Sequence, residues 1–502
     1  MELTTLLLVF LFLLIAYFFY SNINPFEKYG IPYIKPVPIF GNMATPMLCL
    51  TSFGEMVQKV YQFNPKARYV GFFDFNCPTV VIRDPELIKD ISIKNFDNFV
   101  DHRGFVNPEN DPLFGNNLFS LHGDKWREIR NLLSPSFTSS KMKGMFKLMS
   151  DCSKNFTDYW IEESKKGPVN IHSKNAFGRY TTDVIATCAF GITTDSMRNP
   201  KNEFYVLGSK STSFQGLLAF KFFLLRSFPN ICNFFKAKLI DSKVEKFFQK
   251  IIRETIQMRE EKGISRSDMI QLMMETRNKT SQGTRLTIEE MTSQAFIFFF
   301  GGFDTTSILM SFVAHVIAAN PTVQAKLRSE VDEIYKKSNG DPTYEMIKNM
   351  EYLDAIINET LRLYPIAPIL DRICTKPFEL PPALPGGKSF PLKKGDCVWF
   401  PAFGLHRDPA FFSDPDEFKP ERFLVDSKSL LNSPAYLPFG IGPRICIGNR
   451  FALLETKILF FHLIAKCTLK TSHKMHLPLT LDKGVATSAK GGFWLVIEPR
   501  TL

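Results

Sequence analysis

The sequence predicts a mainly α-helical protein with small β-sheets. Helical patterns of apolar residues dominate the 502 residues, and 45% hydrophobic content is enough to bury a large core. Strand signals are few and short. Residues 69–72 and 79–82 flank Asn76-Cys77-Pro78 and predict a pair of strands, and residues 492–498 predict another. Fifty Phe against four Trp indicate a dry, aromatic interior.

The longest helical pattern covers residues 287–320. Thr287 and Glu290 have the spacing of a capping box, and Pro321 follows the end. Asp304 is the only charge from residue 295 to residue 320. Such a segment is long enough to cross a membrane, and it is equally suited to the centre of a large domain. The pair Gly301-Gly302 weakens a helix and indicates a close approach there. Periodicity leaves both interpretations open.

The N-terminus predicts a membrane anchor over residues 1–24. Residues 3–20 are apolar except for Thr4 and Thr5, a length that suits a hydrocarbon core about 30 Å thick. A cleaved signal peptide needs a basic start and small residues at its end. This chain begins Met1-Glu2, and the apolar run ends in aromatic residues that favour a membrane interface. An uncleaved transmembrane helix is therefore expected.

A proline-rich hinge is predicted over residues 25–42, followed by one globular domain over residues 43–502. The hinge contains four prolines, which stiffen a chain, and it is expected to be a spacer that holds the domain near the membrane. Lys28 and Lys35 follow the anchor and favour a cytosolic position for the domain.

Charge and cysteine content exclude several classes of protein. The net charge is +11, but no dense basic run carries interleaved aromatic residues, so nucleic acid is not expected as a partner. An anionic membrane surface or an acidic protein remains possible for part of that charge. The nine cysteines are widely spaced without a CxxC, which argues against a disulfide framework, and no HExxH or Cys/His cluster predicts zinc.

The most informative stretch is Pro438-Phe439-Gly440-Ile441-Gly442-Pro443-Arg444-Ile445-Cys446-Ile447-Gly448. Glycines let backbone N–H groups approach a cysteine sulfur, and a helical pattern that starts at Asn449 would stabilise a thiolate at its N-terminus. Phe439 can shield the sulfur from water. A lone cysteine in a turn is usually structural, but this loop carries the complete pattern F-x-x-G-x-R-x-C-x-G through Phe439, Gly442, Arg444, Cys446 and Gly448.

This pattern resembles the haem-binding loop of the cytochrome P450 family. The resemblance implies the fold of that family and a haem b whose iron takes Cys446 as its axial ligand; such a thiolate donates electron density and favours O–O cleavage. It extends from about Tyr29 to the end of the chain. A dinucleotide fingerprint at Gly440-x-Gly442 lacks its third glycine and a preceding strand, so it is discarded.

Glu359-Thr360-Leu361-Arg362 matches the E-x-x-R motif of the family, and Pro420-Glu421-Arg422-Phe423 supplies a third member. Residues three apart share a helix face, so Glu359 and Arg362 can pair. If the pair lay on the surface, it would contribute less than about 1 kcal/mol to stability and would not indicate a function. The resemblance implies instead that Glu359, Arg362 and Arg422 are buried and lock the region beneath the haem.

Gly301-Gly302-Phe303-Asp304-Thr305-Thr306 resembles the family's (A/G)-G-x-(D/E)-T-(T/S) segment. This decides the long helix in favour of one that crosses the haem face and is not transmembrane. Thr305 can hydrogen-bond to the carbonyl of Gly301 and open the helix locally. The resemblance implies that Asp304 and Thr305 are catalytic and manage protons; a kink with a solvated acid is the plainer alternative.

Several residues match positions that hold the haem propionates. Trp126 and Arg130 lie one helical turn apart, so an indole N–H and a guanidinium can donate from one face. Arg372 and Arg444 match further positions, with His102 of Asp101-His102-Arg103 as a fifth candidate. Family position also suggests substrate-pocket residues, each equally able to be core: Phe105, Phe119, Phe214, Ile297, Phe300, Gly301, Ala367, Ile369 and Phe493.

The resemblance implies a monooxygenase that inserts one atom of O2 into apolar molecules with NADPH electrons from a membrane-bound reductase, cytochrome b5 being a further possible partner. Residues 99–103 and 134–138 resemble those of insect microsomal enzymes, which suggests detoxification of insecticides and plant toxins at the endoplasmic reticulum membrane. Lys125, Lys141 and Lys143 are candidates for reductase docking. Two alternatives remain open, a haem-thiolate isomerase or dehydratase and a multispan binding protein.

Overall fold

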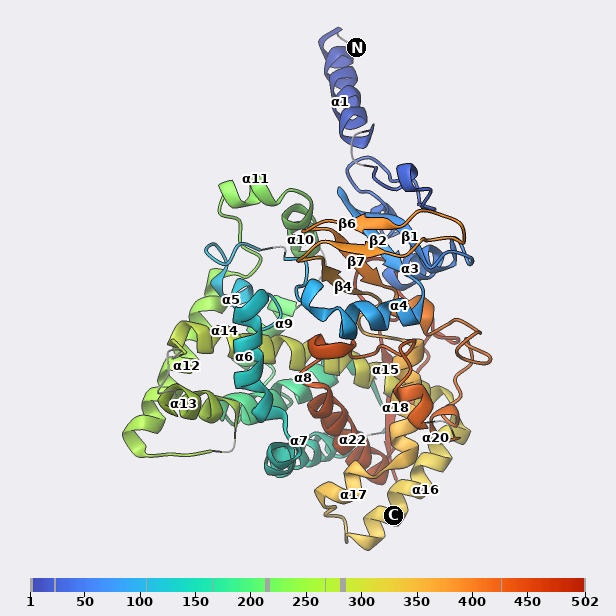
Figure 1. The fold of residues 1–502 in the computed structure, drawn as a ribbon. Helices are drawn as coiled ribbons and strands as arrows, with labels where there is room; N and C mark the ends of the chain where they lie inside the picture. Colours follow the sequence, from blue (N-terminus) through green and yellow to red (C-terminus); the bar gives the residue numbers. More distant parts are fainter. Residues whose placement is uncertain are drawn as a thin grey trace.

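The computed structural model describes residues 3–21, 24–104, 106–165, 167–212, 217–266, 268–279, 286–425 and 427–500. Its described part is mainly helical with three small sheets, so the predicted class is confirmed (Figure 1). The helices of ten or more residues are α1 (Leu3–Ser21), α3 (Phe53–Gln62), α6 (Gly123–Leu133), α7 (Ser139–Ser164), α8 (Ser173–Ile185), α9 (Glu203–Thr212), α10 (Leu217–Ser227), α12 (Ser242–Lys262), α13 (Met269–Lys279), α14 (Ile288–Phe300), α15 (Thr306–Ala319), α16 (Pro321–Lys337), α18 (Glu351–Leu363) and α22 (Asn449–Lys466). Shorter helices are α2 (Ala44–Met47), α4 (Pro85–Lys89), α5 (Pro112–Gly115), α11 (Pro229–Phe234), α17 (Tyr344–Lys348), α19 (Ala402–Leu405), α20 (Arg422–Val425) and α21 (Ser427–Leu431).

The largest sheet has the strand order β1-β2-β7-β4, with β1 (Tyr69–Asp74), β2 (Cys77–Ile82), β7 (Cys397–Phe400) and β4 (Leu370–Ile373). β1 and β2 are antiparallel with Tyr69 opposite Ile82, which confirms the predicted strand pair. A second sheet has the order β3-β9-β8, with β3 (Val169–His172), β9 (Trp494–Pro499) and β8 (Cys467–Thr471). β9 confirms the strand predicted near the C-terminus. β5 (Phe378–Leu380) pairs with β6 (Phe390–Leu392).

The long apolar segment forms one continuous helical rod made of α14, the π-helical turn η6 (Gly301–Thr305) and α15. Thr287 and Glu290 form the predicted capping box, and α16 begins at Pro321. The segment Ile288–Ala319 is long and apolar enough to cross a membrane, but 67% of its most apolar 18-residue stretch is buried inside the protein. Burial on this scale is that of a core helix, because its apolar side chains already pack against neighbouring helices.

α1 extends away from the body of the protein (Figure 1). Its described side chains form a short apolar stretch, Thr4–Leu13, and the apolar residues from Leu6 to Leu13 are exposed. The proline-rich segment that follows packs on the largest sheet. Phe26 is buried and its ring meets that of Phe73 edge to face at 5.6 Å. This segment is therefore tied to the domain by aromatic packing in addition to its stiff backbone.

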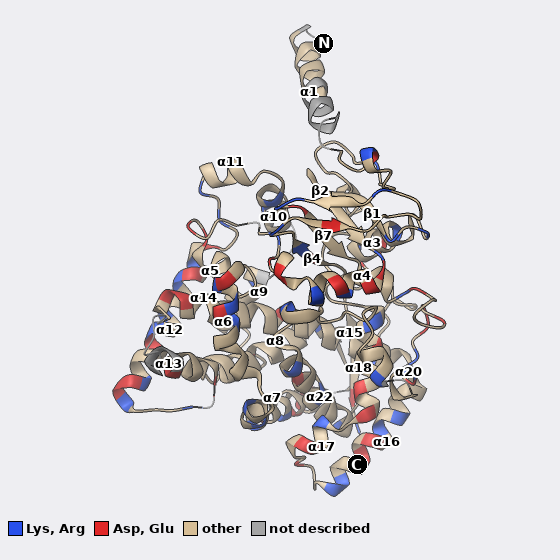
Figure 2. Cartoon of the chain, in the orientation of Figure 1, with Lys and Arg blue, Asp and Glu red and all other residues tan. Residues whose placement is uncertain are grey.

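The main hydrophobic core lies between α7, α8, α14, α15 and α22. Charged side chains gather on the peripheral helices, whereas the long central rod and the sheets are mostly uncharged (Figure 2). Asp304 lies in the π-helical turn at the middle of the rod and is the charge that interrupts this apolar centre. The π-turn and the loop before α22 frame the candidate site.

Candidate active site

The loop that carries Cys446 is folded tightly and ends where α22 begins at Asn449, as the sequence predicts. The Cys446 N–H donates to the Phe439 carbonyl across 2.8 Å and closes the loop. Gly442 has φ +72°, and a Cβ there would lie 2.2 Å from the Ser92 carbonyl oxygen. Only glycine therefore permits this close approach between the loop and residue 92.

The Cys446 sulfur lies in surroundings that act on its charge in opposite directions. Burial raises the pKa of the thiol, whereas the backbone N–H groups of Gly448 and Asn449 and the guanidinium of Arg130 lower it. The side chain still keeps exposed surface. A thiolate at the start of a helix, with backbone donors behind it and one open side, is suited to bind a metal ion.

Two buried arginines lie at this site: Arg444 of the loop, whose guanidinium donates to backbone carbonyls and to Asp101, and Arg372 of β4, which has one N–H without a described partner. Arg444 stacks on the Trp126 ring at 4.0 Å and donates to the Val100 carbonyl at 2.7 Å. Arg372 is 1% exposed, and its Nε has no hydrogen-bond partner among the described residues. Burial lowers the pKa of Arg372 to about 10. Burial also lowers the pKa of Arg444 to about 9, and Arg372 contributes by repulsion.

Buried cations that repel one another favour an anionic ligand, because an added carboxylate would offset both the repulsion and the lost hydration. Asp101 lies 3.4 Å from Arg444, but Arg372 donates to backbone carbonyls alone. The donor set of Trp126, Arg130, Arg372 and Arg444 together with Cys446 therefore fits a haem: the sulfur would be a ligand for its iron, and the arginines would receive its carboxylates.

His102 belongs to a neighbouring network. Its Nδ1 lies 3.0 Å from Asp371 Oδ1, and burial lowers the pKa of its imidazole. The other oxygen of Asp371 accepts the Arg103 N–H at 2.7 Å. Phe119 stacks on the imidazole with ring centroids 4.9 Å apart. His102 thus supports the carboxylate beside Arg372 and links it to an aromatic side chain of the predicted pocket.

The predicted opening of the central helix is present. Thr305 Oγ1 donates to the Gly301 carbonyl, and the backbone between them forms the π-turn. Thr305 is exposed in the middle of a buried rod, and a Cβ on Gly301 would meet nothing within 4 Å. The structure therefore leaves open space on this face of the helix.

Asp304 lies in the same π-turn and forms an ion pair with Lys174 of α8 at 3.3 Å. Burial raises the pKa of this carboxyl group, and Lys174 lowers it. The side chain is 21% exposed. It is therefore an acid held between a buried helix and solvent, and a partner on another helix sets part of its charge.

The E-x-x-R motif is fully buried. Glu359 and Arg362 are both 0% exposed and meet through two hydrogen bonds of 2.7 and 2.9 Å. Arg422 Nε donates to Glu359 Oε1 at 3.0 Å. Arg362 also donates to the carbonyls of His406, Pro415 and Glu417. The structure brings together the three residues that the sequence selected, and it fixes several loop carbonyls on them.

The predicted pocket residues are placed differently from one another. Phe105 and Phe214 lie outside the described residues. Phe119 and Ala367 are exposed, whereas Ile297, Phe300 and Ile369 are partly buried. The rings of Phe119 and Phe300 lie 6.4 and 5.7 Å from that of Phe114, which is buried between them. Phe493 is 1% exposed and packs edge to face on Phe312, so little of its surface is left for a ligand.

Sequence reasoning did not select three residues that the structure joins to the site. His406 accepts the Leu437 N–H on Nε2 and contacts the Arg362 carbonyl through Nδ1, so it connects the E-x-x-R motif to the start of the cysteine loop. Burial lowers its pKa to about 3, so it acts as a neutral imidazole. Lys174 and Asp371 are the others. Nothing in their local sequence marks them, because their partners lie far away along the chain.

Comparison with known proteins agrees with this geometry. The sequence model of the family described as Cytochrome P450 matches residues 31–496. The chain is 41% identical to cytochrome P450 9e2 of Blattella germanica, over 97% of this chain and 96% of that one. It is 37% identical to probable cytochrome P450 9f2 of Drosophila melanogaster, over 98% of both chains, and 36% identical to probable cytochrome P450 6a21 of the same species, over 99% and 100%. The cysteine loop, a cradle formed by Trp126, Arg130, Arg372 and Arg444, and a buried knot formed by Glu359, Arg362 and Arg422 thus occur in a chain that is similar to these proteins over nearly its full length. The chain belongs to the cytochrome P450 family.

Proposed function

We propose that this monooxygenase oxidises neutral apolar small molecules and serves to remove insecticides and plant toxins. Enzymes of the family use haem iron, O2 and electrons from NADPH. The observation that carries the proposal is the pair of rings Phe119 and Phe300, which keep exposed surface on either side of the buried Phe114, together with the open space beside Gly301. Aromatic rings offer a ligand apolar surface and few hydrogen bonds, so they favour hydrophobic compounds of varied shape.

Each residue of the site has a proposed role. Cys446 is the axial ligand of the iron, and Trp126, Arg130, Arg372 and Arg444 hold the propionates. When bound, a haem with a thiolate ligand activates O2. Phe439 shields the sulfur, and Gly442 and Gly448 let the loop backbone lie close to it. Glu359, Arg362 and Arg422 keep the loops beneath this site in one arrangement.

Thr305 and Asp304 are proposed to handle protons on the open face of the helix. The Thr305 hydroxyl is held by the Gly301 carbonyl, which leaves its oxygen as an acceptor beside the open space. Asp304 can exchange protons with solvent because part of its carboxylate remains exposed. A relay from solvent through these side chains supplies protons without flooding an apolar pocket with water.

The test of this function combines a spectrum with a product. The reduced protein under carbon monoxide should show the long-wavelength Soret band of a thiolate-ligated haem. With NADPH and a reductase, it should dealkylate neutral 7-ethoxycoumarin and leave the anionic 7-ethoxycoumarin-3-carboxylate nearly untouched. A preference for the charged compound would contradict the apolar pocket, and a normal spectrum with substrate isomerisation that consumes no O2 would favour the isomerase alternative.

We infer that α1 anchors the protein in the endoplasmic reticulum membrane with the domain over residues 43–502 in the cytosol. The exposed apolar side chains of Leu6–Leu13 favour this, since such a row is stable in lipid and not in water. Removal of residues 1–24 should release the domain from microsomes after a salt wash. A truncated protein that stays in the membrane would instead favour a further span.

The face beside the cysteine loop is proposed to receive the reductase and cytochrome b5. Phe137, just before α7, lies 3.9 Å from the position that a Cβ on Gly448 would take, so the first turns of α7 adjoin the loop. Lys141, Lys143 and Lys147 project from these turns, and the latter two are exposed. Lys125 pairs with Glu290 at 3.0 Å and Lys147 with Asp151 at 3.7 Å, so each of these two lysines contributes less to the basic face than its charge alone suggests. A basic face near the iron would steer an acidic donor.

A further inference from the structure

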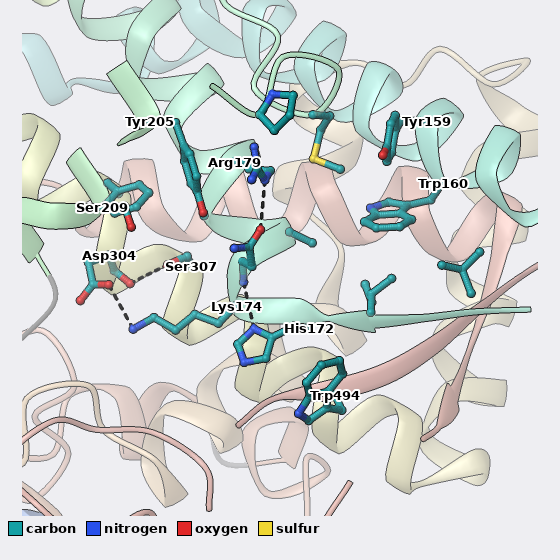
Figure 3. Close-up of a pocket in the computed structure, with 18 of the residues that line it drawn as sticks. Tyr159, Trp160, His172, Lys174, Arg179, Tyr205, Ser209, Asp304, Ser307 and Trp494 are labelled. Atoms are coloured by element: carbon teal, nitrogen blue, oxygen red, sulfur yellow. Dashed lines mark hydrogen bonds and ion pairs between the residues drawn. The ribbon is translucent and has the colours of Figure 1, made fainter. Parts of the chain in front are cut away.

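A cavity of about 740 Å³ lies against the π-turn, and its described lining includes no residue of the cysteine loop (Figure 3). Parts of α7, β3, α8, α9 and β9 surround it, and Phe303, Asp304 and Ser307 of the central rod close one side. Its volume is within the range of small-molecule sites. On a helix, Phe303 and Ser307 lie opposite Gly301 and Thr305, so the rod separates this cavity from the open face beside Thr305.

The walls of the cavity are aromatic. Tyr159 and Trp160 come from α7, Tyr205 from α9 and Trp494 from β9. Tyr159 and Trp160 meet edge to face at 5.1 Å, and Trp494 meets His172 in the same way at 5.0 Å. Figure 3 shows the pair from α7 at the end remote from Asp304. Arg179 lies over the Tyr205 ring at 4.3 Å and Lys474 over the Trp494 ring at 4.3 Å, so an aromatic molecule would use the remaining surface of these two rings.

The polar groups of the cavity carry an excess of positive charge. Lys174 and Arg179 line it, and Asp304 is the one acidic residue among its described lining. Lys174 pairs with Asp304, but Arg179 donates to Asn175 Oδ1 and the Ser196 carbonyl, both neutral. Among the residues that the structure describes, no carboxylate lies within ion-pair distance of Arg179. An anionic group in the cavity would therefore meet Arg179, which has no acidic partner, and Lys174, which it could share with Asp304.

We propose that this cavity is a second binding site, which takes a small aromatic molecule carrying a carboxylate, with its ring among Trp160, Tyr205 and Trp494 and its anionic group at Lys174 and Arg179. A bound carboxylate would compete with Asp304 for Lys174. Since Lys174 stabilises the ionised form of Asp304, its loss would favour the protonated acid. The ligand would thus act as an effector of the π-turn; this consequence rests on the proposed role of Asp304, whereas binding itself does not.

The site is tested by calorimetry on the full-length, haem-loaded protein, with 1-benzylimidazole present at saturation to fill the space at the iron. The probe is 2-naphthoate, and 2-naphthylmethanol is its neutral counterpart. We expect saturable binding of the acid and at least tenfold weaker binding of the alcohol. Lys174→Met and Arg179→Met should each weaken 2-naphthoate at least tenfold, and Lys174→Arg should keep its affinity within threefold.

Lys210→Met on α9 is the matched control, because this exposed lysine lies outside the cavity lining; its affinity should equal that of the parent. Three results would overturn the proposal: equal affinity for the acid and the alcohol, parental affinity in Lys174→Met and Arg179→Met, or displacement of 2-naphthoate by 1-benzylimidazole. Should a variant lose its haem spectrum, the comparison of acid with alcohol on the parent decides alone. No turnover is needed, so failure here is distinct from failure of the proposed reaction.

Discussion

Two clusters of buried arginines in this protein are built on opposite principles. In the E-x-x-R knot, Arg362 has a carboxylate and three backbone carbonyls, and Glu359 receives Arg362, Arg422 and the Lys419 N–H. In the cradle beside Cys446, Arg372 keeps a buried Nε without a described partner, and Arg444 and Arg372 repel each other. In the first cluster the buried charges meet carboxylate and carbonyl partners, whereas the second leaves one buried N–H of Arg372 without a described partner, and we propose that an anionic ligand supplies it.

This difference separates a structural cluster from a binding site. A buried N–H without a partner costs free energy, and a bound anionic ligand can recover that cost. The knot should therefore govern stability of the fold, and the cradle should govern retention of the haem. The following predictions test that division, beginning with the largest effect.

Cys446→Ser is expected to abolish monooxygenation and the long-wavelength Soret band, because an alcohol does not replace the thiolate as ligand. Far-UV circular dichroism should stay unchanged, since Cys446 contributes a ligand and not core packing. Reduced-carbon monoxide spectra and product assays measure the two effects. Normal turnover by a folded, haem-containing variant would remove Cys446 from the site.

Glu359→Gln should destabilise the protein by roughly 3–5 kcal/mol, because it leaves Arg362 and Arg422 buried without a carboxylate. Urea unfolding followed by circular dichroism gives the value. Arg422→Lys is the matched control; its side chain is 10% exposed, so the cost should be smaller. A loss below about 1 kcal/mol in Glu359→Gln would mean that the knot does not govern stability.

Arg372→Met should have the opposite effect: fold stability should hardly change, and haem retention should fall. The unfolding free energy of the apoprotein should change by less than about 1 kcal/mol, because the substitution also removes a buried N–H that has no described partner. The rate of haem transfer to apomyoglobin should rise about tenfold or more, since a charged hydrogen bond to a propionate is lost. Equal haem retention with a large loss of stability would assign Arg372 to the structural class.

Thr305→Ala is expected to keep its haem and its stability while product formed per NADPH falls about two- to tenfold, in line with the loss of one hydrogen bond. Hydrogen peroxide should account for the missing electrons, so both are measured in the same assay. Thr305→Ser retains the hydroxyl and should behave as the parent. An unchanged ratio of product to NADPH in Thr305→Ala would show that the hydroxyl has no part in proton handling.

The smallest effect is expected from charge reversal on α7. Lys141, Lys143 and Lys147 changed together to Glu should slow reduction by the reductase a few-fold and flatten its salt dependence, because exposed contacts are each worth under about 1 kcal/mol. Substrate affinity and the carbon monoxide spectrum should not change. Stopped-flow reduction over a salt series measures the rates, and parallel salt slopes in variant and parent would rule out docking on this face.

The sequence by itself determined the features that depend on local pattern. Mainly helical class, the strand pair at β1 and β2, the capping box at Thr287 and the helix that begins at Asn449 all follow from residues within one turn or one hairpin. The cysteine loop and the E-x-x-R motif were equally visible, because each requires fixed residues at fixed short spacing. The long apolar helix was ambiguous until the motif around Asp304 removed one interpretation.

Tertiary structure decided every feature that depends on partners distant in the chain. The ion pair of Lys174 with Asp304, the link through His406, and the Asp371 carboxylate on His102 join segments that are 31 to 269 residues apart, so no local pattern encodes them. Burial is decided in the same way, since Phe493 and Phe119 look alike in sequence but are 1% and 41% exposed. Whether a side chain packs in the core or faces a cavity depends on which elements meet around it, and that is a property of the assembled fold.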